Sequence, residues 1–401
     1  MNQHVVVIED HPFQLNVMGM VLKSLGMENV QPFECGYKAL EFIEASSVDL
    51  ILCDLNMPMI DGIELLKRLA EADFQGNIII TSAESKTVLD AARKMCKAFN
   101  LNLLGVLEKP IAKESLSKLI NLNSTKEAAA SNSNSDIVIT AEDIAKAVSN
   151  QEFMFYYQPI VCIHSGEWRE SESLIRWQHP RYGVLSPFFF LSRLLESGKM
   201  GEVMKYLINQ AINEKSFLGE RRFAINLTAK DIIDGDIVDY IFALIDQGEL
   251  ETEQIKLELT ESDLVESVAL ALASTTRICM RGIPLAIDDF GTGYSSLKQL
   301  DDLPFSALKL DIDFVKNIQS SRSSHAIVRA TLYLAHLLEL STVAEGVEDH
   351  SLWMDIREIS NVDTLVQGYF IARPMPARKL LEWKEDWDSK IKELNLIKEI
   401  K

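Results

Sequence analysis

Short apolar runs alternate with stretches of helical periodicity along most of this chain of 401 residues. Runs that are apolar throughout are typical of parallel strands covered on both faces. The stretches between them carry apolar residues three and four positions apart, as amphipathic helices do. The alternation predicts an α/β protein built on parallel sheets.

One composition shift divides the alternation in two. Residues Asn121–Asp136, NLNSTKEAAASNSNSD, are rich in Asn, Ser and Ala and predict a linker between domains 1–120 and 137–401. The first domain is predicted to be a doubly wound parallel sheet of the flavodoxin-like kind, and the second a (β/α)8 barrel. The tail Ala377–Lys401 predicts a charged amphipathic helix, interpreted as a solvated cap.

The predicted strands of the first domain are Val5–Ile8, Leu50–Cys53, Ile78–Thr81 and Gly105–Leu107. Those of the second are Phe153–Ile160, Ser171–Ile175, Arg222–Leu227, Ile255–Leu259, Pro284–Asp288, Ala307–Leu310, Thr342–Ala344 and Leu365–Phe370.

The net charge of the chain indicates which binding partners are not expected. Asp and Glu number 59 against 40 Lys and Arg, which gives a formal net charge of −19. Such a surface repels phosphate backbones, so neither DNA nor an anionic membrane is expected as a partner, and a phosphate substrate would need metal cations. No signal peptide or membrane-spanning run is recognised, and five scattered cysteines fit a reducing compartment, so a cytoplasmic protein is expected.

Acidic residues follow the first two predicted strands of the first domain. Glu9 and Asp10 come after one strand and Asp54 after the next; Ser82 ends a third, and Lys109 follows a fourth. These positions converge at the carboxyl edge of a parallel sheet. Each acid alone is best interpreted as an ordinary loop residue, but the set predicts a Mg²⁺ site beside a nucleophilic carboxylate, Asp54.

The second domain repeats this arrangement with more acids, also at predicted strand ends, where the active sites of (β/α)8 barrels lie. Adjacent Asp288 and Asp289 suit a pair of cations, and Lys309 is a lone base on an apolar strand that could orient an attacking water. The polar residues at these positions are Glu172, Asn226, Glu258, Glu261, Asp288, Asp289, Asp311, Glu345 and Glu348.

The first domain resembles the receiver domain of two-component response regulators through VVVIEDHP, DLNMPMIDG, SA and EKP. The resemblance implies that Asp54 accepts a phosphoryl group, that Glu9, Asp10 and Asp54 hold one Mg²⁺, and that Ser82 and Lys109 are the switch residues. It also implies a sensor histidine kinase or phosphotransfer protein as a partner. Val106 replaces the aromatic residue that usually reports phosphorylation.

The second domain resembles the EAL family of cyclic di-GMP phosphodiesterases through motifs such as KLELTES, AIDDFGTGYSSL and QGYFIARPMP. Its signature triplet reads Glu172-Ser173-Leu174, with serine in place of alanine. The resemblance implies a modified barrel with an antiparallel first strand, a homodimer or higher homo-oligomer, and hydrolysis of cyclic di-GMP to linear pGpG with Mg²⁺ or Mn²⁺.

The resemblance also implies individual roles. One metal would be held by Glu172, Asn226, Glu258 and Asp288, and the other by Asp288, Asp289 and Glu345. Lys309 would position the attacking water, while Glu261 would tether the loop Gly291–Ser295 and support dimerisation. The positions that match nucleotide-contacting or further site residues are Gln158, Leu174, Arg176, Gln367, Asp311 and Glu348.

Two other functional classes compete with the enzyme. A non-hydrolysing cyclic di-GMP receptor would have lost metal ligands, yet every ligand position is filled here. A transcription factor would need a basic reading helix, which the sequence lacks. The sequence therefore favours a response regulator with phosphodiesterase output.

Overall fold

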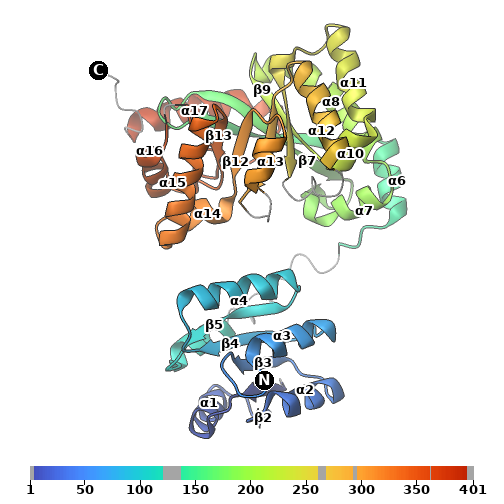
Figure 1. Cartoon of the computed structure of the whole chain (residues 1–401). Coiled ribbons are helices and arrows are strands. Elements are labelled where there is room, and N and C mark those ends of the chain that lie inside the picture. Colours follow the sequence, from blue (N-terminus) through green and yellow to red (C-terminus); the bar gives the residue numbers. More distant parts are fainter. Residues whose placement is uncertain (1–3, 121–136, 261–267, 292–295, 362, 395–401) are drawn as a thin grey trace. The chain divides into compact units, whose positions relative to one another are not determined.

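The chain separates into two compact units, Met1–Asp136 and Ile137–Lys401. The computed structural model describes residues 4–120, 137–260, 268–291, 296–361 and 363–394 (Figure 1). The predicted linker Asn121–Asp136 and the predicted loop tether Glu261 lie outside the described residues. None of the helices in the described ranges has the length and apolar content of a membrane span.

The first unit is a five-stranded parallel sheet with the strand order β2-β1-β3-β4-β5. Its elements are β1 (Val5–Ile8), α1 (Pro12–Ser24), β2 (Val30–Phe33), α2 (Gly36–Ala45), β3 (Leu50–Asp54), α3 (Gly62–Glu71), β4 (Asn77–Ser82), α4 (Lys86–Ala98), β5 (Asn102–Glu108) and a helix at 113–120.

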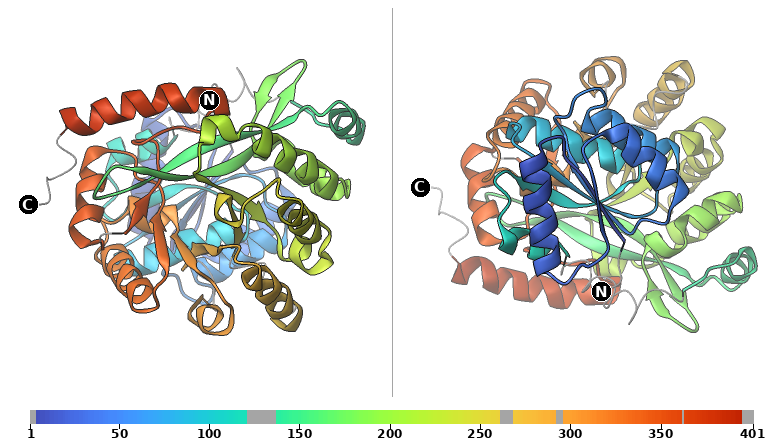
Figure 2. Two further views of the ribbon diagram at one scale, coloured as in Figure 1. Left: turned by 90° about the horizontal axis from the view of Figure 1, so that it is seen from above. Right: turned by 90° about the horizontal axis from the view of Figure 1, so that it is seen from below.

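Alternate residues of these strands enter two separate cores, because side chains of a strand point to opposite faces. Val5 and Val7 pack with α1 and the helix at 113–120. Val6 and Ile8 pack with α2, α3 and α4 on the other face. Helices therefore cover both faces of the sheet, as Figure 2 also shows, and the flavodoxin-like prediction is confirmed.

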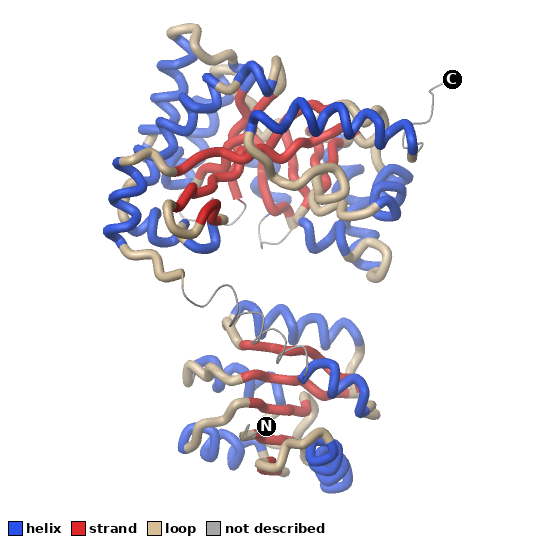
Figure 3. Tube along the Cα trace, turned by 180° about the vertical axis from the view of Figure 1, so that it is seen from behind, coloured by secondary structure: helices blue, strands red, loops and turns tan. Residues whose placement is uncertain are grey.

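The second unit is a closed barrel of eight strands. The hydrogen-bonded order β6-β14-β13-β12-β11-β10-β9-β7 is closed by the pairing of β6 with β7, and β8 extends β7 outside the ring. Strand β6 is antiparallel to both of its barrel neighbours, β7 and β14. The predicted modified (β/α)8 barrel is thereby confirmed, with helices outside the strands (Figures 2 and 3).

The strands of the second unit are β6 (Phe153–Cys162), β7 (Trp168–His179), β8 (Gly183–Leu185), β9 (Arg222–Leu227), β10 (Ile255–Thr260), β11 (Leu285–Phe290), β12 (Ala307–Leu310), β13 (Ser341–Ala344) and β14 (Leu365–Val366). Its helices are α6 (Ala141–Ser149), α7 (Leu191–Glu196), α8 (Met200–Asn213), α9 (Lys215–Leu218), α10 (Ala229–Asp234), α11 (Asp236–Asp246), α12 (Val268–Met280), α13 (Ser296–Asp302), α14 (Ile312–Lys316), α15 (Arg322–Leu337), α16 (His350–Ile359) and α17 (Leu380–Glu393), with 3₁₀ turns η1 (Pro187–Phe189), η2 (Thr252–Gln254) and η4 (Ala377–Lys379).

The tail helix α17 is part of the barrel's core rather than a solvated cap. One face buries Leu380, Trp387 and Ile391, and the Trp387 indole donates a hydrogen bond to the Gly166 carbonyl at 2.8 Å. The interpretation as a solvated cap was wrong because it gave more weight to the charged face than to the tryptophan spacing. A buried Trp contributes several kcal/mol, about 3–5 on removal, which outweighs the exposed charges.

Candidate functional site

The first acidic cluster lies at the carboxyl edge of the five-stranded sheet of the first unit, next to the point where the strand order reverses at β1. Lys109 lies between two buried acids: its ammonium is 2.6 Å from Glu9 Oε2 and 2.7 Å from Asp54 Oδ2. Burial lowers the pKa of Lys109, but hydrogen bonds to Asp54 and Glu9 more than offset it and raise the pKa overall. The lysine is therefore a fixed positive charge beside Asp54.

Asp10 completes this cluster. One carboxylate oxygen from each of Glu9, Asp10 and Asp54 lies within 4.8 Å of the others, an all-oxygen set that suits a hard divalent cation. Ser82, the last residue of β4, is buried, and its hydroxyl accepts a hydrogen bond from the Glu84 amide at 3.1 Å. The structure thus brings the five predicted residues to one edge of the sheet.

The second cluster surrounds Lys309, which β12 places inside the barrel with 1% exposure. The ammonium is 2.7 Å from Glu258 Oε2, 2.7 Å from Glu345 Oε1, 3.1 Å from Asp288 Oδ1 and 3.7 Å from Glu172 Oε1. These four acids come from four barrel strands: Glu172 lies in the middle of β7, Glu258 and Asp288 lie in the second halves of β10 and β11, and Glu345 directly follows β13. The charge of Lys309 offsets part of their mutual repulsion.

Side-chain amides fix Glu172 in this cluster. Asn226 Nδ2 donates to Glu172 Oε1 at 2.8 Å, and Gln367 Nε2 donates to Glu172 Oε2 at 2.7 Å. Gln367 also donates to Gln158 Oε1 at 3.0 Å, and Gln158 in turn donates to the Ala372 carbonyl. The predicted residues Asn226, Gln158 and Gln367 therefore form one network around a carboxylate.

An irregularity in β11 brings two adjacent carboxylates to the same edge. Neighbouring side chains of a regular strand point to opposite faces. The pairing of β11 with β12 shifts register between Ile287 and Phe290, and Asp289 has a positive φ of 53°. Such a bulge re-aims side chains, and here it allows Asp288 and Asp289 to serve one site.

The crowded carboxylates resist ionisation to different degrees. Burial raises the pKa of Glu345 to about 8, with Lys309 opposing the shift, and burial together with Asp288 raises the pKa of Asp289 to about 6. Burial also raises the pKa of Glu258. For Glu172, burial is outweighed by Lys309 and the two amides, so its pKa is lowered. A cluster of this kind gains stability from added cations.

The residues present fit two divalent cations. Oxygens of Glu172, Glu258 and Asp288 lie within 4.8 Å of one another, as do those of Asp288, Asp289 and Glu345, so Asp288 is common to both groups. Glu258 Oε1 is fully buried and accepts no hydrogen bond from the residues that the structure describes. The Lys256 ammonium, 3.3 Å away, is an ion-pair partner of this oxygen but does not donate a hydrogen bond to it, so the oxygen keeps lone pairs that a divalent cation could use.

The remaining predicted residues are arranged around this centre. Leu174 and Arg176 follow Glu172 along β7, and the Arg176 guanidinium lies 5.8 Å from the Tyr156 ring centroid. Asp311 caps α14 by accepting a hydrogen bond from the Asp313 amide at 2.8 Å. Glu348 is half-exposed and pairs with Lys316 at 2.7 Å, outside both cation-sized groups.

Sequence reasoning missed two buried charged residues below the centre, Glu170 and Lys256, which form an ion pair. A signal for them was present: Glu170 precedes Glu172 by two residues, and Lys256 precedes Glu258 by two. In strands, residues two apart share a face. The inward face of β7 and β10 therefore had to carry these charges as well.

Comparison with known proteins identifies both units. Residues 5–121 match the family described as response regulator receiver domain, and residues 141–374 match the EAL domain family. Because the EAL match covers more than half of the chain, the protein belongs to the EAL domain family and carries a receiver domain before it.

One relative shares this whole organisation. The cyclic di-GMP phosphodiesterase RocR of Pseudomonas aeruginosa is 30% identical over 386 residues, which cover 95% of this chain and 98% of RocR. The cyclic di-GMP phosphodiesterase PdeR of Escherichia coli is 35% identical over 245 residues, which are 60% of this chain and 37% of PdeR.

A solved structure of the PaMucR phosphodiesterase in complex with c-di-GMP is 31% identical and superposes with a TM-score of 0.56. The superposed region covers 60% of this chain and 98% of the solved PaMucR chain.

Proposed function

We propose that this protein is a response regulator whose EAL barrel hydrolyses cyclic di-GMP to linear pGpG with two Mg²⁺ or Mn²⁺ ions. The observation that carries the proposal is the presence of two clusters of three acids each beside the buried ammonium of Lys309. The two clusters have Asp288 in common. Two relatives named cyclic di-GMP phosphodiesterases, one of them matched along nearly its whole length, support the substrate assignment.

The cation ligands follow from the two groups. Glu172, Glu258 and Asp288, with the amide oxygen of Asn226, would hold one ion, and Asp288, Asp289 and Glu345 the other. Bound there, two divalent cations would supply activation of water and stabilisation of the leaving oxygen of a phosphodiester. Asp288, which belongs to both groups, would help to hold both ions, and the amides of Asn226 and Gln367 would keep Glu172 oriented.

Lys309 is proposed to position the attacking water. Its ammonium has three protons, and its four carboxylate neighbours keep it charged because they raise its pKa well above the usual value despite burial. With Glu258, Asp288 and Glu345 holding cations, one of the protons that now face these acids would be free to donate a hydrogen bond to a water oxygen and orient that water toward phosphorus. The same charge would stabilise the negative charge that develops on the phosphate.

Binding of the nucleotide is assigned to the rim of the same site. Arg176 would pair with a phosphate, and Gln158, Leu174, Gln367 and Asp311 would contact the nucleotide. Glu348 and Glu261 are proposed as further acids of the site, although Glu348 pairs with Lys316 here and Glu261 lies outside the described residues. A homodimer is proposed as the working assembly.

The receiver is proposed to regulate the barrel through Asp54. A sensor kinase or phosphotransfer protein would phosphorylate Asp54, with one Mg²⁺ held by Glu9, Asp10 and Asp54. Lys109 already contacts Asp54 Oδ2 and would pair with the added phosphate charge, while the Ser82 hydroxyl would donate a hydrogen bond to it.

The test is turnover of cyclic di-GMP by the full-length protein in Mg²⁺, in Ca²⁺ and in a chelator, with products separated by chromatography. We expect pGpG in Mg²⁺ and none in the chelator. Ca²⁺ prefers longer bonds of about 2.3–2.6 Å and looser coordination, so it should permit substrate binding but suppress turnover. Binding of cyclic di-GMP without any turnover in Mg²⁺ or Mn²⁺ would instead identify a non-hydrolysing receptor.

A further inference from the structure

A second layer of buried charge lies directly below the proposed metal centre. Glu170 on β7 and Lys256 on β10 are 4% and 2% exposed at the side chain and contact each other closely. Each lies two residues before a proposed metal ligand on the same strand, Glu172 and Glu258. The pair thus lies under the metal centre on the inward face of the barrel.

Lys256 also reaches the metal centre itself. Its ammonium is 3.3 Å from Glu258 Oε1, and the other oxygen of Glu258 is 2.7 Å from the ammonium of Lys309. Glu258, which is fully buried, therefore lies between two cations. Three further acids around the metal centre already balance Lys309, so Lys256 needs an acid of its own if it is not to neutralise Glu258.

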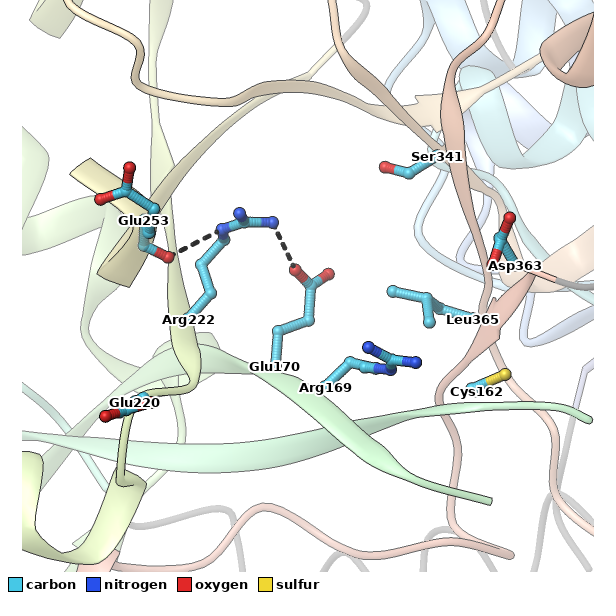
Figure 4. Close-up of a pocket in the computed structure, with 9 residues that line it drawn as sticks. All are labelled: Cys162, Arg169, Glu170, Glu220, Arg222, Glu253, Ser341, Asp363 and Leu365. Carbon is cyan, nitrogen blue, oxygen red and sulfur yellow. Dashed lines mark hydrogen bonds and ion pairs between the residues drawn. The ribbon is translucent and has the colours of Figure 1, made fainter. Parts of the chain in front are cut away.

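Glu170 is the acid in position to supply that balance. Among the described residues, the carboxylates within ion-pair distance of Lys256 are Glu170, the closer, and Glu258. Glu170 Oε2 is also 3.6 Å from Arg222, at the edge of a cavity of about 400 Å³ (Figure 4). Arg222, Ser341 and Leu365 begin their strands, so the cavity is at the end of the barrel opposite the metal centre.

We propose that Glu170 is a positioning residue for the metal centre: by neutralising Lys256, it leaves the negative charge of Glu258 available to a divalent cation. The inference rests on the proposed function, in which Glu258 is a metal ligand. Glu170 touches neither substrate nor metal in this account and acts through Lys256.

Lys256 and a divalent cation compete for one carboxylate, that of Glu258. A buried ammonium that loses its counter-ion is strongly destabilised and moves to any carboxylate within reach. Without the charge of Glu170, Lys256 has Glu258 as its remaining partner among the described residues. The ammonium would then compete with the cation for the oxygens of Glu258, and metal affinity would fall. Removing Lys256 as well would end the competition.

The test measures Mn²⁺ binding by electron paramagnetic resonance, without substrate, in full-length protein carrying Asp10→Asn to weaken the receiver's cation site. We expect Glu170→Gln to raise the Kd for Mn²⁺ by at least about tenfold, and the double variant Glu170→Gln/Lys256→Met to return it to within about threefold of the parent. Glu142→Gln, which removes an exposed acid paired with Lys146, is the matched control and should leave the Kd unchanged.

The double variant separates positioning from simple structural support. It lacks every contact that Glu170→Gln lacks, so a merely structural role predicts binding at least as weak as in the single variant. Weak binding in the double variant, or unchanged binding in Glu170→Gln, would overturn the proposal. If Glu170→Gln does not fold, the double variant is compared with the parent directly. A Kd for Mn²⁺ that is about tenfold higher in the double variant would contradict the proposal.

The parent protein, which carries Asp10→Asn alone, tests the proposed metal centre separately from the role of Glu170. An Mn²⁺ signal that is absent from Asp288→Asn supports the metal centre regardless of what Glu170 does. If the parent binds no Mn²⁺ in the barrel, the proposed metal centre fails, and the inference about Glu170 fails with it.

Discussion

Lys309 illustrates how one side chain can hold an acidic centre together. Its ammonium lies within 4.0 Å of carboxylate oxygens from Glu172, Glu258, Asp288 and Glu345, and it is 1% exposed. Buried charges of this kind are stabilised only by close counter-ions. The lysine and the acids therefore depend on each other, and losing the lysine leaves the acids with unbalanced repulsion.

Replacing Lys309 with methionine should lower kcat for cyclic di-GMP by at least about a hundredfold, roughly 2.7 kcal/mol, since the charge that positions water is lost. The measurement is kcat at saturating Mg²⁺. Lys146→Met, which removes an exposed lysine paired with Glu142, is the control and should retain the parental rate. A kcat for Lys309→Met within a few-fold of wild type would argue against the assigned role.

At the residue scale, the sequence predicted which side chains would gather because strand ends converge in both folds. It did not predict which contacts they would make. The pairing of Glu348 with Lys316, and the cap that Asp311 forms on α14, depend on loop paths that periodicity does not encode. Glu170 and Lys256 were missed because charged residues inside a barrel are uncommon, although their spacing was visible.

The shortest barrel strand, β14, shows the limits of periodicity at the element scale. The apolar run predicted a strand over Leu365–Phe370, but the structure ends it at Val366, and that prediction was too long. A Cβ at Gly368 would lie 2.0 Å from the Val347 carbonyl oxygen. The chain after β14 passes against the backbone that follows β13, and only glycine permits this approach.

Gly368→Ala should therefore destabilise the barrel by about 1–3 kcal/mol or more, because the backbone atoms it meets cannot move aside as a flexible side chain would. Chemical denaturation followed by tryptophan fluorescence measures the loss. Gly201→Ala is the matched control: Gly201 lies in α8 with open space around it, so alanine there should be neutral or slightly stabilising. Equal stability of the two variants would contradict the close approach.

Other elements were missed for definable reasons. Strand β2 is an edge strand that contains Pro32 and has no fully buried residue, so it lacks the apolar run of a central strand. The three-residue strand β8 pairs only with β7, outside the ring. The strands β1, β3 and β12 were predicted well because they are buried along their whole length, which leaves a nearly continuous apolar signal.

At the scale of the whole molecule, two separate units each carry an acidic cluster with a lysine in contact with it. In the receiver the lysine faces a proposed phosphoryl acceptor, and in the barrel it faces a proposed hydrolytic centre. Regulation requires that phosphorylation change the populations of two conformations that differ in activity. Val106, partly buried against the core beside α4, replaces the aromatic side chain that usually reports this change.

With valine at that position, we expect phosphorylation of Asp54 to change turnover only a few-fold, a coupling of about 1 kcal/mol or less. Wild type and Asp54→Ala are treated with acetyl phosphate and Mg²⁺, and initial rates of pGpG formation are compared. The account is contradicted if both proteins respond alike. It is also contradicted if neither responds while mass spectrometry confirms phosphorylation of the wild type.

The central claim is that the carboxylates around Lys309 form a two-cation hydrolytic centre, and the most direct measurement is the Mg²⁺-dependent rate of cyclic di-GMP hydrolysis by Asp288→Asn. Asp288 is common to both candidate cation groups, so its neutral replacement should weaken both. Asp246→Asn, which alters an exposed acid paired with Arg281, serves as the control. The account predicts a fall of at least about several-hundredfold for Asp288→Asn; a rate within about tenfold of wild type, a loss of only roughly 1.4 kcal/mol, would contradict it.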